Sequence, residues 1–290
     1  MAQNATPTTV TQVASGVFVA EGQVALASPA NLGAIANRAF IVGDEAVAVI
    51  DTGGSFVNGV SFKAAIRAIT QLPIRYVINT HMHPDHVLGN AAFRDEGTVF
   101  VGHAKLPRAL ASRAQQYLQS NRALIGEVGF AGTEIVPPTV LVDSTMTLDL
   151  GRRILRLTAY PTAHTDNDLT VFDENTKTLL LGDLLFMDHL PALDGSLNGW
   201  IDVLDTLVTM PAARAVPGHG PVSVPWPQGA DAERAYLTAL RGNLRAAVKA
   251  GWPLARALDA IPPDKPEDWR LIEDFHKRNI SAAYGEMEWE

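Results

Sequence analysis

Three histidines and one aspartate stand within a single short segment, residues 81–86, which reads HMHPDH. Imidazole and carboxylate groups supply the nitrogen and oxygen atoms that zinc accepts at about 2.0–2.2 Å. His81 and His83 can share one metal ion if both side chains point into the same cleft. Asp85 and His86 follow too closely to serve that same ion comfortably. The spacing therefore indicates two adjacent metal ions rather than one.

Three further candidate ligands follow apolar runs later in the chain. His164 comes after the strand-like run 154–157. Asp183 ends the run 178–183, and His219 follows an apolar pair and a Pro-Gly dipeptide. Each lies among glycine or proline, which is typical of loops at the edge of a sheet. Together with the first segment, they give five histidines and two aspartates that can hold two ions with one carboxylate between them.

The order and spacing of these residues resemble the signature of the dinuclear hydrolases in the metallo-β-lactamase superfamily. The resemblance runs from about Gly16 to His219. Residues 49–54 (VIDTGG), 161–168 (PTAHTDND) and 182–186 (GDLLF) are similar to the quinoprotein-relay and sulfur-oxidation-associated zinc metallohydrolases of bacteria. Those are periplasmic members of the superfamily with poorly defined substrates.

The resemblance implies an α/β fold, the four-layer αβ/βα sandwich, with the metal site at one edge. It implies one zinc held by His81, His83 and His164, a second held by Asp85, His86 and His219, and Asp183 bridging the two. Asp85 is also assigned a catalytic role. Asp51 is expected either to orient a ligand histidine or to form an Asx turn with the residues that follow it. His189 is close enough in sequence to Asp183 to line the pocket, but we favour a role other than metal binding.

The function implied is a dinuclear zinc-dependent hydrolase in which a metal-bridging hydroxide attacks a carbonyl substrate such as a thioester, lactone or ester. The chain has no cysteine and no convincing Ser-His-Asp set, so it offers no protein nucleophile. Iron and manganese are the alternatives to zinc. Other hypotheses are a β-lactam-hydrolysing enzyme, an iron-dependent redox enzyme, and a non-catalytic metal-binding module in a periplasmic oxidation system. Asp183 argues against the first, because true metallo-β-lactamases generally lack the bridging aspartate.

Composition limits the partners. The net charge of −8 would repel the phosphate backbone, so we predict a small-molecule substrate and no nucleic acid.

No apolar stretch reaches the roughly 20 residues that a membrane span needs. The first residues, MAQNATPTT, lack the basic and apolar regions of a signal peptide and read like the polar start of a mature secreted protein. We therefore expect a periplasmic or secreted protein, with the cytoplasm as the alternative.

The remaining pattern predicts a single domain over residues 16–290, ending in helices, after a flexible segment over residues 1–15. Strands are predicted at 16–20, 38–42, 46–50, 74–78, 140–142, 146–148, 154–157 and 178–183, and helices at 57–72, 103–127 and 230–249. His103 is predicted to cap the second of these helices. His276 is predicted to lie on a solvated helix face.

Overall fold

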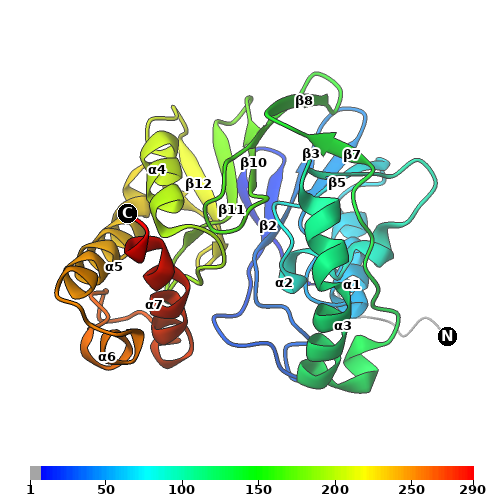
Figure 1. The fold of residues 1–290 in the computed structure, drawn as a ribbon. Helices are drawn as coiled ribbons and strands as arrows, with labels where there is room; N and C mark the ends of the chain where they lie inside the picture. The colour runs from blue at the N-terminus through cyan, green and yellow to red at the C-terminus, as the bar shows by residue number, and fades with distance from the viewer. Residues whose placement is uncertain (1–7) are drawn as a thin grey trace.

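Two β-sheets packed face to face form the centre of the protein (Figure 1). The computed structural model describes residues 8–290. One sheet has seven strands in the order β1-β2-β3-β4-β5-β6-β7, and the other has six in the order β13-β12-β11-β10-β9-β8. The elements are β1 (Thr11–Ala14), β2 (Val17–Ala20), β3 (Arg38–Val42), β4 (Val47–Ile50), α1 (Phe56–Ile69), β5 (Ile74–Ile78), α2 (Pro84–Val87), η1 (Asn90–Phe93), β6 (Val99–His103), α3 (Leu106–Phe130), β7 (Val140–Val142), β8 (Thr145–Asp149), β9 (Ile154–Ala159), β10 (Leu169–Asp173), β11 (Thr178–Phe186), α4 (Leu197–Leu207), β12 (Arg214–His219), β13 (Val224–Pro225), η2 (Gln228–Ala230), α5 (Asp231–Lys249), α6 (Leu254–Ala260) and α7 (Ile272–Glu288).

Apolar side chains from both sheets meet in a shared core between them. Ile41 and Ile50 come from the first sheet, and Leu157 and Val171 come from the second. Helix α1 packs on the outer face of the first sheet. Helices α4 to α7 cover the outer face of the second (Figure 1). Helix, sheet, sheet and helix are the layers of the αβ/βα sandwich, so the predicted fold class is confirmed.

The strands that precede the candidate ligands run in parallel where the site forms. Strands β4, β5 and β6 are parallel neighbours, and so are β11 and β12. The carboxyl ends of parallel strands meet at one edge of a sheet, which is where ligands bind in open α/β sheets. The register of β11 on β12 shifts after Leu180 and pairs Phe186 with His219. The loops that follow these strands therefore open toward the same edge of the sandwich.

Helix boundaries follow local signals. The hydroxyl of Ser55 accepts a hydrogen bond from the N–H of Asn58 at 3.3 Å and caps the start of α1, and Pro73 follows its end. Helix α3 begins later than predicted because His103 remains in β6, opposite Val142 of β7. His103 does not cap α3 as predicted: its Nδ1 accepts from the N–H of Lys105, and Lys105 is the N-cap residue.

Two further expectations need correction. Residues 11–14 of the segment predicted to be flexible form β1, which pairs antiparallel with β2; residues 1–7 lie outside the described part of the chain. His276 is buried rather than solvated. It lies between α5 and α6, where Nδ1 accepts from the hydroxyl of Tyr236 at 3.2 Å and Nε2 donates to the carbonyl of Ile261 at 3.0 Å. The residue pattern around His276 does not show that α5 and α6 cover that face of α7.

No helix within residues 8–290 combines the length and the apolar character that crossing a bilayer would require.

A carboxyl group is buried in the first turn of α5, beneath β11. Glu233 is fully buried, and its Oε1 accepts the N–H of Phe186 at 3.0 Å. Its Oε2 has no hydrogen-bond partner among the described residues. Burial outweighs that one hydrogen bond and raises the pKa of Glu233 well above its usual range.

Replacing Glu233 by glutamine should stabilise the protein increasingly as the pH rises. A pKa raised by folding means that the native state binds the proton more tightly, so the stability it contributes is complete below the unfolded pKa of about 4.3 and is lost above it. Relative to Glu233→Gln, the wild type should lose up to about 1.4 kcal/mol of unfolding free energy per pH unit from there toward the folded pKa. Denaturant unfolding of both proteins from pH 4 to pH 9 measures this, and parallel pH profiles would contradict it.

Candidate metal centre

All seven predicted ligands meet at one edge of the sandwich, although they come from four separate parts of the chain. Ligand atoms of each group lie within 4.8 Å of one another. The first group is His81, His83, His164 and Asp183, and the second is Asp85, His86 and His219. The histidines and Asp85 fall into the two groups that the family resemblance implies, while Asp183, expected between the groups, falls within the first.

Three ring nitrogens of the first group face one another. Nδ1 of His83 lies 3.1 Å from Nε2 of His81 and 3.0 Å from Nε2 of His164. Oδ2 of Asp183 lies 3.6 Å from the first of these Nε2 atoms and 3.5 Å from the second. Ligands of a tetrahedral zinc lie roughly 3.3 Å apart, given the bond lengths that zinc makes. Three nitrogens and one oxygen therefore have the arrangement of a four-ligand metal site.

The second group shares the same carboxylate. Oδ1 of Asp183 lies 3.0 Å from Nε2 of His86, and its Oδ2 lies 3.4 Å from Nε2 of His219. Oδ2 of Asp85 lies 3.3 Å from Nε2 of His219 and 3.6 Å from Nε2 of His86. Asp183 thus stands between the two groups and contacts both.

Hydrogen bonds behind the ligands decide which ring nitrogen keeps its lone pair. The hydroxyl of Thr80 donates to Oδ2 of Asp51, so it must accept from Nδ1 of His81 at 3.0 Å. Nδ1 of His86 donates to Oδ2 of Asp51 at 2.8 Å, and Nε2 of His83 donates to a carboxylate at 3.0 Å. In the neutral form of each imidazole the other nitrogen is then the unprotonated one, and it faces the centre.

Asp51 therefore orients a ligand histidine, and its contacts decide between the two roles left open by the sequence. It also accepts the backbone N–H of Thr80 at 2.9 Å. Its backbone has φ of 58°, a left-handed conformation that costs energy for a non-glycine residue. A cost of this kind is typical of functional sites, where the surrounding hydrogen bonds hold the residue in place.

The carboxylate that holds His83 belongs to Asp194, which we did not predict. Two nitrogens of Arg113 on α3 bind this carboxylate at 2.7 and 3.2 Å. Burial raises the pKa of Asp194, but His83 and Arg113 outweigh burial and lower it to about 2. Metal-binding histidines generally donate their second ring N–H to an acceptor. The acceptor for His83 lies 111 positions away and looks in the sequence like part of an Asp-Gly turn.

Burial and neighbouring charges favour cations at this site. Burial lowers the pKa of both His81 and His164, the latter to about 3, so both imidazoles are neutral and keep a lone pair. Burial would raise the pKa of Asp85, but the charge of His86 and other imidazoles outweighs it and lowers the value to about 2. The imidazoles around Asp183 likewise outweigh burial and hold its pKa well below its usual range. Neutral imidazoles and ionised carboxylates are the forms that bind metals.

At the other end of the centre the carboxylates act on the imidazoles. Burial lowers the pKa of His219, but Asp183 and Asp85 outweigh burial and raise it to about 9. The same two carboxylates raise the pKa of His86 against the effect of burial. The charges that favour a proton here also favour a metal cation.

Unpaired buried atoms give a test of whether a metal fits. Nε2 of His86 and Oδ1 of Asp183 are buried and lie 3.0 Å apart, yet neither has a hydrogen-bond partner in the described part of the chain. They are close without being aligned as donor and acceptor. Buried polar atoms are rarely left unpaired. An ion bound between them would satisfy both, so the residues fit a metal.

Comparison with known proteins assigns the family. The model of the metallo-β-lactamase superfamily matches residues 34–219, more than half of the chain. The chain belongs to this superfamily. It is also 36% identical over 62 residues to the linear primary-alkylsulfatase of Pseudomonas sp. (strain ATCC 19151), a match that covers 21% of this chain and 12% of that protein.

Solved structures of the superfamily share the fold at low sequence identity. The inverting sec-alkylsulfatase Pisa1 of Pseudomonas sp. aligns with a TM-score of 0.70 and 17% identity, over 96% of this chain and 50% of that one. A metallo-β-lactamase of Pontibacter korlensis aligns with a TM-score of 0.62 and 18% identity, over 79% of this chain and 98% of that one. The chain thus spans about half the length of the sulfatase and nearly all of the lactamase.

Two glycines leave room for the Asp183 carboxylate between the two ligand groups. Gly182 has φ of 52°, and a Cβ atom there would lie 2.5 Å from the hydroxyl oxygen of Thr80. A Cβ atom on Gly218 would lie 2.0 Å from Oδ1 of Asp183. Strands β11 and β12 can bring the carboxylate between the two groups only because both positions lack a side chain.

An aromatic wall backs the imidazoles. The ring of Phe186 stacks on His219 with centroids 4.9 Å apart, and the ring of Trp200 lies 5.1 Å from His164. His189 lies 5.0 Å from His219 and 5.9 Å from Phe275 of α7, while its Nδ1 donates to the carbonyl of Leu190 at 2.8 Å. His189 belongs to neither ligand group and forms part of this wall. The wall shields one side of the centre from water.

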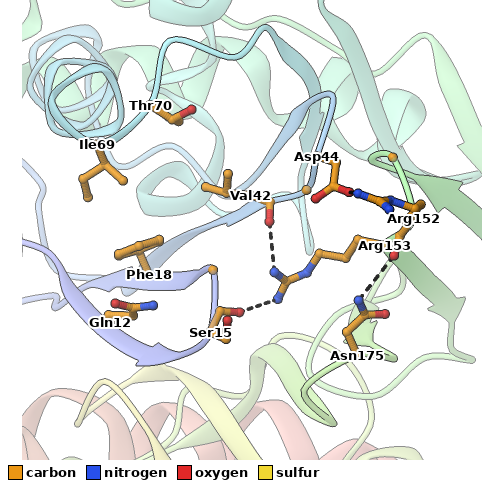
Figure 2. A pocket seen from close by; sticks show the side chains of 13 residues that line it. Gln12, Ser15, Phe18, Val42, Asp44, Ile69, Thr70, Arg152, Arg153 and Asn175 are labelled. Carbon is orange, nitrogen blue, oxygen red and sulfur yellow. Dashed lines mark hydrogen bonds and ion pairs between the residues drawn. The ribbon is translucent and has the colours of Figure 1, made fainter.

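A cavity of about 270 Å³ lies beside the centre, and Asp85 lines it. A larger hollow of about 460 Å³ lies elsewhere and contains none of the seven ligands (Figure 2). There Arg153 donates to the carbonyls of Val42 and Ser15, both at 2.9 Å, and pairs with Asp173. Its donors are used to join segments of the fold, whereas the cavity beside Asp85 reaches a candidate metal ligand.

Replacing Gly218 by alanine should weaken zinc binding about tenfold or more, because the added methyl group displaces the Asp183 carboxylate. Gly242→Ala is the matched control, since its Cβ atom meets nothing within 4 Å. Zinc affinity measured by chelator competition should fall only in the first variant. Equal affinity in both variants would show that the position of Asp183 does not control metal binding.

Proposed function

We propose that this chain is a dinuclear zinc-dependent hydrolase that acts on carbonyl substrates such as thioesters, lactones and esters. The observation that carries the proposal is the position of Asp183, whose two oxygens contact imidazoles of both ligand groups at 3.0–3.6 Å. Two zinc ions bound in such a site supply a hydroxide near neutral pH and polarise the substrate oxygen. Iron or manganese in the same ligand set is the alternative occupancy.

The chain's own residues hold and orient the reactants. His81, His83 and His164 would hold one ion, and Asp85, His86 and His219 the other. Asp85 also lines the cavity, where its ionised carboxylate can accept a hydrogen bond from the attacking water and orient it. The aromatic wall of Phe186 and Trp200 limits access of bulk water from behind.

The substrate class follows from the leaving group. We find no side chain in the ligand groups that is free to protonate a poor leaving amine. Thiolates leave without that help, since their conjugate acids have a pKa near 8.5. Thioesters and activated esters therefore suit this centre better than amides, and a dedicated β-lactamase role is disfavoured.

Sulfate esters are the second candidate substrates. The sec-alkylsulfatase structure aligns with 96% of this chain, whereas the metallo-β-lactamase structure aligns with 79% of it. When the alkyl carbon of a sulfate monoester is attacked, the C–O bond breaks and sulfate leaves as a stable anion, so this reaction also needs no general acid. We further propose a periplasmic location, which rests on the resemblance stated above and not on a feature of the fold.

A panel of substrates tests the proposed function. Zinc-loaded protein should hydrolyse small thioesters or lactones with a higher kcat/KM than β-lactams and phosphodiesters, with alkyl sulfates run alongside. A clear preference for β-lactams or phosphodiesters would overturn the carbonyl proposal, and a preference for alkyl sulfates would support the second candidate. No turnover in any class would favour a non-catalytic metal-binding module.

Asp183→Ala should remove most of this activity and weaken binding of the second metal, while the circular dichroism spectrum stays close to that of the wild type. The expected loss in kcat/KM is on the order of a hundredfold or more, because the variant removes the one residue shared by both groups. Asp202→Ala, an exposed aspartate on α4, is the control and should behave as the wild type. Normal turnover by Asp183→Ala at limiting zinc would refute the bridging role.

A further inference from the structure

The cavity beside Asp85 joins the metal centre to the C-terminal helices. Its lining comes from α2, from α3, from the loop between β2 and β3, and from α7 through Arg278. In Figure 1, α7 and α3 stand on opposite sides of α2. A molecule that reacts at the centre and extends into this cavity would therefore meet Arg278.

Arg278 is exposed and has no ion pair or hydrogen bond to any residue in the range 8–290. Two nearby cations do have partners: Lys277 pairs with Asp259 at 3.0 Å, and Arg256 stacks on the ring of Trp252. The guanidinium group is charged at any ordinary pH and offers a planar fork that matches a carboxylate. An unpaired guanidinium in a cavity is a ready anion-binding group.

Most of the remaining lining is apolar, with Ser120 and Asn121 of α3 as its polar side chains. Leu26 and Leu124 line it and are 46% and 50% exposed, which is high for large hydrophobic side chains. Ile35 adds to the same surface. Asp85 is the one acidic residue in the lining, and it belongs to the metal centre. The cavity thus has a metal-binding end, an apolar middle and a cationic rim.

We propose that Arg278 is a specificity-determining residue that binds an anionic group at the far end of the substrate. The substrate class is a carbonyl compound whose acyl part carries a short apolar segment and a terminal carboxylate or similar anion. This proposal rests on the proposed function, because it assumes that the reacting carbonyl lies at the metal centre. A volume of about 270 Å³ limits the apolar segment to a short chain.

Pairs of carboxylates of equal length test the proposal by binding. Calorimetry on zinc-loaded protein compares straight-chain monocarboxylates with the α,ω-dicarboxylates of four to eight carbons. One carboxylate is common to both members of a pair and can bind the metal centre, so the difference reports the second carboxylate. At least one dicarboxylate should bind about tenfold more tightly than its partner, as expected for a charged hydrogen-bonded pair.

Variants of α7 then show which residue causes the difference in affinity between dicarboxylates and monocarboxylates. Arg278→Ala should abolish the dicarboxylate advantage without changing monocarboxylate affinity, and Arg278→Lys should keep part of it. Lys277→Ala, the neighbouring exposed cation, should keep all of it. Since Arg278 makes no contact that holds the fold, the melting temperatures should not differ. An advantage that survives in Arg278→Ala, or that is absent from the wild type at every length, would overturn the proposal.

Measurements of substrate turnover distinguish a failure of this proposal from a failure of the proposed function. If the wild type shows the dicarboxylate advantage but hydrolyses no carbonyl substrate, anion binding by Arg278 stands and the hydrolase proposal fails. If thioesters are hydrolysed but terminal carboxylates give no advantage in binding or in kcat/KM, the hydrolase proposal stands and the role of Arg278 fails.

Discussion

The buried carboxylate of Asp183 is the constraint to which the rest of the site is adapted. It is 4% exposed and has four imidazole nitrogens within 3.6 Å. A buried carboxylate remains ionised only where cationic groups compensate the loss of hydration. Glycines 182 and 218 give it room, and the shifted register between β11 and β12 points it toward the edge. The hydrogen bonds of Asp51, Thr80 and Asp194 then turn the imidazoles to face it.

Much of the fold and most of the candidate site could be predicted because their signals are local. The strand at 74–78 has the predicted bounds, since a β-branched run between Pro73 and a polar segment specifies a strand without tertiary help. The spacing of three histidines and an aspartate within six residues indicated two adjacent ions, and the family resemblance supplied the assignment of all seven ligands to two groups. That their side chains converge is a finding of the structure, while the metal they would hold remains a proposal.

The features that were missed depend on contacts between distant segments. Asp194 supports His83 across 111 residues, and no local pattern distinguishes it from a turn aspartate. His276 occupies a helix with charged neighbours, and its burial depends on Tyr236 and Ile261, which belong to other elements. The same holds for Arg278, which gains a role only because α7 packs beside the centre. The alignment to the sec-alkylsulfatase extends over 96% of this chain, so the C-terminal helices belong to the shared fold.

The central claim is that one carboxylate joins two metal sites. Titration of metal-free protein with zinc, followed by calorimetry and by elemental analysis after desalting, tests it most directly. The account predicts that close to two zinc ions bind per chain, and that His164→Ala, which alters only the first group, still binds one. A single tightly bound ion per chain, with no further uptake when zinc is added, would contradict the account.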